Sequence, residues 1–264
     1  MSELSNWEPA LRISIFAAVA LLLLIAEATA PRRVRRAIRL MSTNIALFVT
    51  NTLFIRIIST TSLVGVGLVA DSAGYGLLSL TGFAPWLEAV VAFLVLDGAL
   101  YTQHRLMHRI PFLWRFHRIH HADPDFDVTT GVRFHPAEIL VSFIVKAVVI
   151  LAIGTGPLTV VVFEATLSSA SLFTHANLKL SAHLDTYLRR FFVTPEMHRI
   201  HHSVKASEHN RNFCFFLSCW DLLFGSYCAE SAAAQRTMAI GLKTISADEA
   251  NSFRKMLIHP FQRI

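Results

Sequence analysis

The chain has 264 residues, of which 53% are hydrophobic and only 16% are charged, and its mean hydropathy is +0.49. Because soluble domains carry about 25% charged residues, this composition excludes an ordinary soluble protein and indicates one domain with a membrane region. The net charge of +6 is also typical of nucleic-acid-binding proteins, but the basic residues lie between apolar runs, which is the positive-inside pattern of membrane proteins. We therefore predict membrane contact and no nucleic-acid partner.

The first predicted element is a membrane helix over residues 11–30, a mostly apolar stretch long enough to cross the hydrocarbon core. No basic start precedes it and no small-residue cleavage site follows it, so we expect a retained helix rather than a signal peptide. Five arginines follow within residues 31–39. Their place between two apolar runs favours a short cytoplasmic loop over a nucleic-acid-binding arm.

Two further membrane segments are predicted before the first histidines. One runs from residue 44 to about residue 69 and contains Arg56, which either snorkels or faces a partner helix. Residues 71–83 then form a turn or an interfacial segment, and a third apolar run, 84–101, leads directly into a pair of histidines. With the arginine loop inside, the third helix re-enters the cytoplasm and delivers that pair on the inner side.

The rest of the chain alternates between loops and shorter segments. Residues 122–136 carry turn formers and no apolar period, so we predict a loop. The apolar segments 137–153 and 158–174 are predicted to form a full or a shallow re-entrant hairpin, with both ends on the cytoplasmic side. From residue 176 onward we expect short cytoplasmic helices, and in the tail a surface helix that begins near Ala247.

Histidine is the residue type whose pattern indicates a function. Eleven of the 13 histidines lie between residues 104 and 202, and the sequence HRIHH occurs twice, at 117–121 and at 198–202. A pair spaced by four, His104 and His108, precedes the first copy. On a helix, residues three and four apart lie on one face, so each cluster directs its imidazoles to a common point. A lone histidine is usually a core residue, but three such clusters predict a metal site.

One metal ion cannot use so many imidazoles, whereas two ions with four or five ligands each can. We expect the clusters to supply eight ligands, and His175 at the mouth of the hairpin and His135 in a loop to add two more. The ten candidates are His104, His108, His117, His120, His121, His135, His175, His198, His201 and His202. His183 and His209 are weaker because they share no helical period with a cluster, and His259 is expected at the surface.

Two carboxylates lie on helical faces that lead to histidines. Asp97 lies within the third apolar run and shares a face with His104. An intramembrane carboxylate is costly without a partner, and ligating histidines often donate their second N–H to a carboxylate. Asp97 is therefore expected either to orient His104, to stabilise a nearby arginine, or to remain a hydrated charge near the helix end. The same argument applies with less force to Glu164 and His175.

The residue types do not name the metal, because imidazole suits zinc, copper, iron and nickel. Context favours iron: a redox-inert zinc pair has no evident task at a bilayer surface, whereas oxidation of an unactivated C–H bond in a long apolar substrate calls for dioxygen and an iron-type oxidant. Cysteine offers no competing site. Cys214, Cys219 and Cys228 form no CxxC motif and are expected to be free thiols.

The ordered motifs HRLMH, HRIHH, RFHP, HANL, TPEMHRIHH and WDLLFGSY resemble the fatty acid hydroxylase/sterol desaturase superfamily of integral membrane proteins. The resemblance covers roughly Asp97 to Tyr227. It implies two iron ions held by the histidines of these motifs, O2 as co-substrate, and electrons from a separate donor protein such as a ferredoxin, a cytochrome or a reductase. In two respects the chain departs from similar proteins: Cys214 stands where they usually have glycine, and no haem-binding cytochrome domain is fused.

Together these observations predict an all-α integral membrane bundle of about three spans plus a fourth and fifth in a hairpin, with a cytoplasmic helical cap that holds a histidine-rich dimetal site. We assign residues 1–92 to the first membrane helices and the basic loop, 93–228 to the hydroxylase-like domain, and 229–264 to a cytoplasmic tail. The expected function is oxygen-dependent hydroxylation or desaturation of a C–H bond in a lipid, such as a sterol or a fatty acyl chain. The alternatives are a carotenoid or other isoprenoid hydroxylase, and a catalytically silent metal-binding membrane protein.

Overall fold

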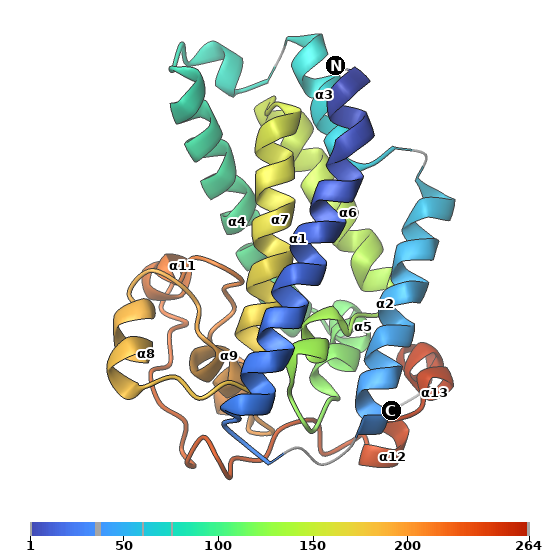
Figure 1. The fold of residues 1–264 in the computed structure, drawn as a ribbon, viewed down its shortest axis with the longest axis vertical. Helices are drawn as coiled ribbons and strands as arrows, with labels where there is room; N and C mark the ends of the chain where they lie inside the picture. The colour runs from blue at the N-terminus through green and yellow to red at the C-terminus, as the bar shows by residue number, and fades with distance from the viewer. Residues whose placement is uncertain (1, 35–37, 60, 75, 263–264) are drawn as a thin grey trace.

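A computed structural model describes residues 2–34, 38–59, 61–74 and 76–262, and Figure 1 shows the arrangement of its helices. Within these residues the chain is entirely helical apart from loops, turns and isolated β-bridges, which confirms the predicted all-α class. Arg35 and Arg36, which belong to the predicted arginine loop, lie outside the described residues.

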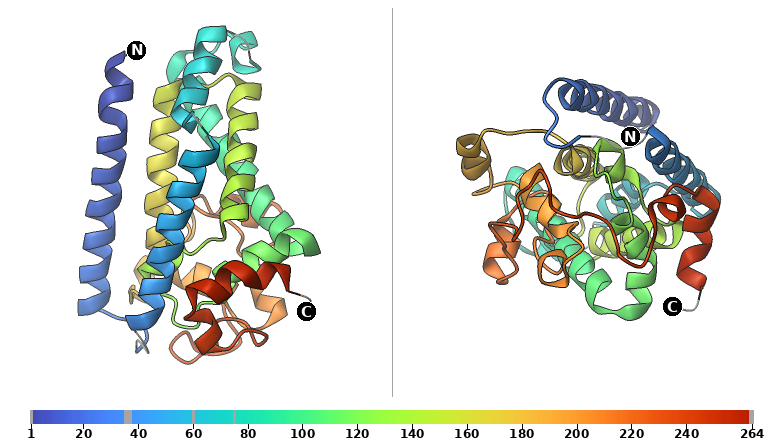
Figure 2. Two further views of the ribbon diagram at one scale, coloured as in Figure 1. Left: turned by 90° about the vertical axis from the view of Figure 1, so that its right-hand side faces the viewer. Right: turned by 90° about the horizontal axis from the view of Figure 1, so that it is seen from below.

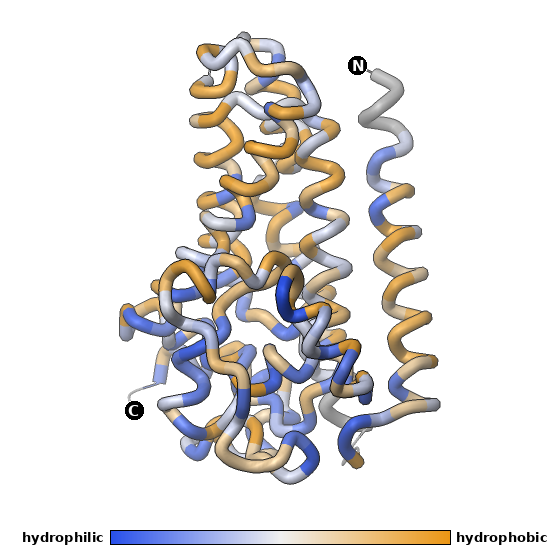
Figure 3. The backbone as a smooth tube through the Cα atoms, turned by 90° about the vertical axis from the view of Figure 1, so that its left-hand side faces the viewer, coloured by the Kyte–Doolittle hydropathy of each residue, from blue (hydrophilic) through white to orange (hydrophobic). Residues whose placement is uncertain are grey.

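Long apolar helices form a bundle that makes up one half of the molecule (Figure 1). They are α1 (Ser2–Thr29), α2 (Ile38–Ile58), α4 (Pro85–Arg109), α6 (Pro136–Ile153) and α7 (Pro157–His175), with the shorter α3 (Leu63–Ala73) and the 3-10 helix η1 (Leu78–Leu80) at the end where the N-terminus lies. Five segments within the described residues are long and apolar enough to cross a membrane. Figure 3 shows that apolar residues dominate this half of the molecule. The predicted membrane bundle, with three spans and a hairpin, is therefore confirmed.

The second predicted span is broken in the structure. We expected one apolar segment over residues 44–69, but α2 ends at Ile58 and α3 begins at Leu63. The break occurs at serines. Ser59 Oγ donates to the carbonyl oxygen of Thr61 at 2.6 Å, and Ser62 Oγ caps α3 by accepting from the Gly65 amide at 3.1 Å. Serine side chains that bond nearby backbone groups compete with helical hydrogen bonds, which is why an apolar count alone did not find this boundary.

The predicted hairpin consists of two complete helices, α6 and α7. Their 18 and 19 residues correspond to roughly 27–29 Å at about 1.5 Å per residue, close to the thickness of the hydrocarbon core. Gly154 ends α6 with a φ of 75°, a left-handed conformation that favours glycine. Pro157 then starts α7 at a position where its missing N–H costs no hydrogen bond.

Short helices gather at the end of the bundle opposite the N-terminus and form a cap, as Figure 2 shows from two further sides. They are α5 (Pro111–His121), η2 (Val128–Val132), α8 (Ala182–Leu188), α9 (Pro195–His201), α10 (Ala206–His209), α11 (Cys219–Leu223), α12 (Ala247–Ala250), α13 (Phe253–Ile258) and η3 (His259–Phe261). The helix predicted near Ala247 is present as α12. It starts with a capping box in which Ser246 and Glu249 bond each other's backbone amides.

Buried arginines fasten the cap to the bundle. Arg133 is fully buried and donates to the Ile119 carbonyl, the Asn44 side chain and the Ala250 carbonyl at 2.7–3.0 Å, so it ties together α5, α2 and α12. These bonds satisfy a guanidinium that would be very costly to bury alone. The loop over residues 122–136, which contains η2, is thereby held against both halves of the molecule.

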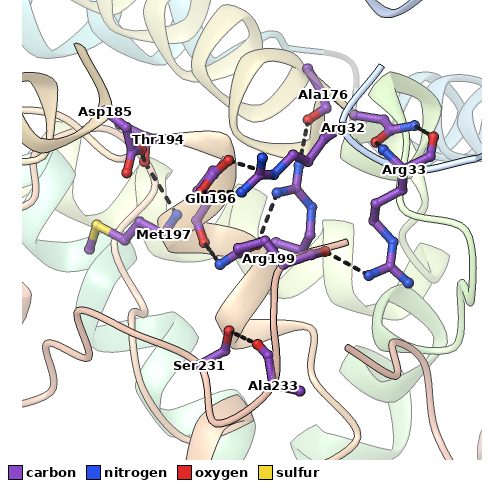
Figure 4. A network of polar contacts seen from close by, with 12 residues as sticks. Arg32, Arg33, Ala176, Asp185, Thr194, Glu196, Met197, Arg199, Ser231 and Ala233 are labelled. Atoms are coloured by element: carbon purple, nitrogen blue, oxygen red, sulfur yellow. Dashed lines mark hydrogen bonds and ion pairs between the residues drawn. The ribbon is translucent and has the colours of Figure 1, made fainter. Parts of the chain in front are cut away.

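A second arginine network joins the segment after α1 to the cap (Figure 4). Arg32 Nε lies 2.8 Å from a carboxylate oxygen of Glu196 in α9. Arg199, also in α9, donates to the carbonyl of Ala176 at 3.2 Å and to the side chain of Gln235 at 3.0 Å. Since Ala176 directly follows α7, these contacts fix α9 against the end of the hairpin.

Candidate metal centre

The three predicted histidine clusters meet where the bundle joins the cap. His104 and His108 lie in the last turns of α4, and His175 ends α7. Both copies of HRIHH lie on short cap helices: the first ends α5, and the second runs through α9 into the following residue. The four helices therefore direct their histidines into one region between membrane bundle and cap.

Nine of the ten predicted ligands fall into two compact groups. In each group, one candidate ligand atom per residue lies within 4.8 Å of the corresponding atoms of the others. Group one consists of His104, His108, His117, His121 and His201; group two consists of His120, His175, His198 and His202. All are buried except His108, which is half-buried.

Each HRIHH copy contributes its first and last histidines to one group and its middle histidine to the other group. From the first copy, His117 and His121 belong to group one while His120 belongs to group two. From the second copy, His198 and His202 belong to group two while His201 belongs to group one. On a helix, the side chains at positions i and i+4 point in nearly the same direction, about 40° apart. The side chain at position i+3 points about 100° away from the one at i+4. Each HRIHH copy therefore gives two rings to one group and one ring to the other, so the prediction that each cluster directs its imidazoles to one common point is wrong for these two clusters.

The hydrogen bonds of group one show why a cation fits there. His104 Nδ1 lies 2.6 Å from the carbonyl oxygen of Phe213, and His201 Nδ1 lies 2.7 Å from that of Arg211. A carbonyl only accepts, so both Nδ1 atoms carry hydrogen and, in a neutral ring, both Nε2 atoms carry a lone pair. These two Nε2 atoms are 3.0 Å apart. Two lone pairs facing each other at this distance repel, unless a cation lies between them.

Group two repeats the arrangement. His120 Nδ1 lies 3.0 Å from the carbonyl oxygen of Arg133, and His175 Nδ1 lies 2.7 Å from that of Ser171. Their Nε2 atoms are 3.0 Å apart. Two metal–nitrogen bonds of about 2.0–2.1 Å at a right angle place their nitrogens roughly 3 Å apart. The spacing of the nitrogens in both groups is therefore the spacing of histidines that could hold a metal ion.

Burial favours the neutral form of five histidines of the cap, and the neutral form is the one that binds a metal ion. Desolvation lowers the pKa of these five well below the usual value, and neighbouring histidines lower it further. The five are His120, His121, His198, His201 and His202. A neutral imidazole keeps the lone pair that a metal ion requires, so binding here does not have to displace a proton at neutral pH.

His135, the tenth predicted ligand, lies outside both groups. It is the N-cap of α6: Nδ1 accepts from the Ala137 amide at 3.1 Å, and Nε2 lies 3.2 Å from the Leu257 carbonyl oxygen. With Nδ1 accepting and Nε2 donating, a neutral ring has no lone pair left for a metal. We predicted a metal ligand at this position, but Nδ1 caps α6 and Nε2 bonds a carbonyl of α13.

Asp97 does not contact His104, whose Nδ1 is occupied by Phe213. Instead, Asp97 Oδ2 accepts from the indole N–H of Trp220 at 2.8 Å and from the Leu217 amide at 3.4 Å. It thereby holds the loop before α11 against α4. Glu164 likewise has other partners than His175. Its oxygens lie 2.8 Å from Lys146 Nζ and 3.5 Å from a guanidinium nitrogen of Arg12.

Sequence reasoning missed two acidic residues beside the site. Glu138 Oε1 lies 2.6 Å from His117 Nδ1, in the first turn of α6. Asp221 accepts from the amides of Phe213 and Cys214 at 2.9 and 3.0 Å, and so supports the loop whose carbonyls orient His104 and His201. The motifs RFHP and WDLLFGSY lead to both residues, because Glu138 is the second residue after the first motif and Asp221 is within the second.

Aromatic rings enclose the two groups. Phe134 stacks on His120 with ring centroids 4.5 Å apart, and Phe215 lies 4.8 Å from His104. Trp114 lies 4.8 Å from His108 and stacks on His209, which is outside both groups. His183 is exposed and His259 half-buried, also outside the groups. The apolar surround limits water and strengthens electrostatic interactions within the site.

Comparison with known proteins identifies the same region. The sequence model described as fatty acid hydroxylase matches residues 89–226, just over half of the chain. The chain is 30% identical over 178 residues to the ornithine lipid hydroxylase OlsE of Rhizobium tropici, which covers 67% of this chain and 51% of that protein. It is 28% identical over 179 residues to the alkylglycerol monooxygenase of Homo sapiens, covering 68% of this chain and 38% of that protein.

A third relative is the sphinganine C4-monooxygenase 1 of Arabidopsis thaliana, 29% identical over 142 residues, which cover 53% of this chain and 54% of that protein. The chain thus spans about half of the length of two of these relatives and less of the other. No solved structure matches this chain.

Proposed function

Because this chain belongs to the fatty acid hydroxylase family, we propose that it is an oxygen-dependent membrane oxidoreductase that hydroxylates or desaturates a C–H bond of a lipid. The observation that carries the proposal is the pair of histidine groups at the end of an apolar helical bundle. The named relatives are hydroxylases and monooxygenases, among them enzymes named for an ornithine lipid, an alkylglycerol and sphinganine.

The nine histidines of groups one and two are the proposed ligands of two iron ions, and His135 is not one of them. In support, neutral Nε2 lone pairs converge in both groups with no proton available between them. Iron is preferred over zinc because the proposed reaction needs a redox-active metal. When bound, such a centre supplies the activation of O2 that protein side chains cannot provide.

The chain's own residues position and protect that chemistry. Backbone carbonyls hold the Nδ1 protons of His104, His120, His175 and His201, which fixes the orientation of these rings. Aromatic side chains next to the rings keep the site apolar. Because α4 and α7 run from the bundle into the site, we propose that the lipid approaches along these helices.

We place the histidine groups on the cytoplasmic side, as the arginine-rich segment after α1 favours under the positive-inside rule. Oxygen insertion consumes two electrons and two protons for each O2, with one oxygen atom entering the product and the other leaving as water. We therefore include a separate electron donor in the proposal, a ferredoxin, a cytochrome or a reductase.

Untargeted lipid mass spectrometry tests the function. Cells expressing the protein should contain a lipid that gains one oxygen or loses two hydrogens relative to cells without it, and isotopically labelled O2 should label a hydroxylated product. His201→Ala should abolish the change. His183→Ala is the matched control, because His183 is exposed and outside both groups. Identical lipid profiles with wild-type protein and His201→Ala would refute an oxidative function for this site.

A further inference from the structure

His117 has a different kind of partner from the other oriented rings. Four of the nine proposed ligands direct Nδ1 to a backbone carbonyl: His104, His120, His175 and His201. In His117, the atom that Nδ1 meets is a carboxylate oxygen, Oε1 of Glu138, at 2.6 Å. Both side chains are almost fully buried, with 1% of His117 and 6% of Glu138 exposed. The contact is therefore a short, charge-assisted hydrogen bond shielded from water.

The local fold accounts for a buried carboxylate at this position. His135 caps α6 and Pro136 is its first residue, so Glu138 lies in the first turn of the helix. Negative charge is stabilised there by the helix dipole and by amides without helical partners. The second oxygen of Glu138 has no hydrogen-bond partner among the described residues. Among the described residues, His117 is thus the side chain whose N–H this carboxylate accepts.

His117 is central to group one. Its Nε2 lies 2.9 Å from Nε2 of His104 and 3.2 Å from Nε2 of His121. A carboxylate that accepts the Nδ1 proton makes the opposite nitrogen a stronger electron donor. The oriented rings of group two are His120 and His175. Within the described residues, Nδ1 of His120 meets a backbone carbonyl, and Nδ1 of His175 meets a backbone carbonyl and the Thr174 hydroxyl.

We propose that Glu138 is a positioning residue that makes the two metal positions electronically unequal, by giving group one the more strongly donating ligand set. This inference rests on the proposed function, since it requires one ion in each group. With an iron ion in each group, the Glu138 carboxylate would stabilise the more highly charged state of the ion in group one, and that ion would therefore have the lower reduction potential of the two.

The test separates the charge of Glu138 from its geometry. Glu138→Gln keeps an oxygen that can accept from His117 but removes the charge, whereas Glu138→Ala removes both. Glu164→Gln is the matched control, because Glu164 is a buried carboxylate of the bundle that pairs with Lys146 and Arg12. The purified proteins are loaded with the Mössbauer-active isotope of iron, and iron content, quadrupole doublets and reduction potentials are measured.

In the wild-type protein and in Glu164→Gln we expect two unequal iron environments. Glu138→Gln should keep both ions, alter one doublet, raise the potential of one ion and leave the other unchanged. Glu138→Ala should in addition bind one ion about 10- to 100-fold more weakly. If a variant does not retain iron, the same proteins are loaded with Co²⁺ instead, and the visible spectrum of Co²⁺ reports the two metal environments.

Two results would overturn the inference: unchanged spectra and potentials in Glu138→Gln at full metal content, or equal changes at both ions. Neither result bears on the proposed function. Conversely, a wild-type protein that binds no iron but shows two Co²⁺ environments, one of them sensitive to Glu138→Gln, would contradict the iron assignment and still support the role of Glu138.

Discussion

The loop over residues 211–214 offers a sharp test of how the ligands are held, and Asp221 is the residue to change. Asp221 is fully buried, and its carboxylate accepts from the amides of Phe213 and Cys214 and from the hydroxyl of Ser226 at 2.7–3.0 Å. The same loop presents the carbonyls that orient His104 and His201. Asp221 therefore acts on two group-one ligands through the backbone, without touching either ring.

The size of the effect follows from the bonds that are lost. Asp221→Ala would leave two buried amides without an acceptor, at about 1–3 kcal/mol each. That total of about 2–6 kcal/mol is a large part of a native stability of about 5–15 kcal/mol, so Ala would confound loss of metal with loss of fold. Asp221→Asn keeps one acceptor oxygen and should reduce the free energy of unfolding by about 1–3 kcal/mol. Metal affinity of group one should fall by about 10- to 100-fold while group two keeps its ion.

A chelator titration of purified Asp221→Asn, with metal counted per protein, measures this directly. The expected curve has two steps, with one ion removed at a lower chelator concentration than in the wild-type protein. Asp97→Asn is the comparison, because Asp97 bonds Trp220 and Leu217 and should leave both metal affinities unchanged. Equal loss of both ions in Asp221→Asn, or wild-type retention of both, would refute the argument that the loop orients group one.

Three further outcomes are expected. His135→Asn should keep both ions and lose only a modest amount of stability, because asparagine also caps helices and His135 has no free lone pair. If metal analysis shows that one ion is lost, His135 belongs to the ligand set. Removal of metal by a chelator should lower the midpoint of thermal unfolding of the detergent-solubilised protein and expose the cap to limited proteolysis, since unpaired Nε2 atoms then face each other; identical melting with and without metal contradicts this. A cysteine added at the C-terminus should resist a membrane-impermeant thiol reagent in intact cells, and labelling there would reverse the proposed orientation.

The sequence predicted the elements of this site well because the relevant information is local. The spacing of the histidines within each cluster is set by one helix, and α4, α5 and α9 are helices at those positions. Spacing cannot say what each nitrogen meets. His135 and Glu138 come from one short segment, yet the histidine serves the end of α6 and the carboxylate serves His117. Which of these two side chains reaches the site depends on the position of α6 relative to α5 in the folded protein.

The carbonyls that orient the rings were also beyond sequence reasoning. Phe213 and Arg211 belong to a loop in which Asn212 has a φ of 53°, a left-handed conformation that no hydrophobic period reveals. Asp97 illustrates the opposite error. Its helical face correctly leads to His104, but the indole of Trp220, more than a hundred residues along the chain, competes successfully for the carboxylate. Long-range partners of this kind are decided by packing.

The exchange of middle histidines between the HRIHH copies has a consequence for how the protein holds together. Each group draws ligands from the bundle and from both cap helices α5 and α9: group one takes His104 from α4, and group two takes His175 from α7. An ion in either group therefore connects bundle and cap, and a shift of α9 displaces ligands of both groups together. The groups differ in the number of histidines, five against four. They also differ in the partners of Nδ1, which are a carboxylate at His117 and carbonyls at the other oriented rings. The paired helices thus make the two positions structurally interdependent, while Glu138 makes them chemically different.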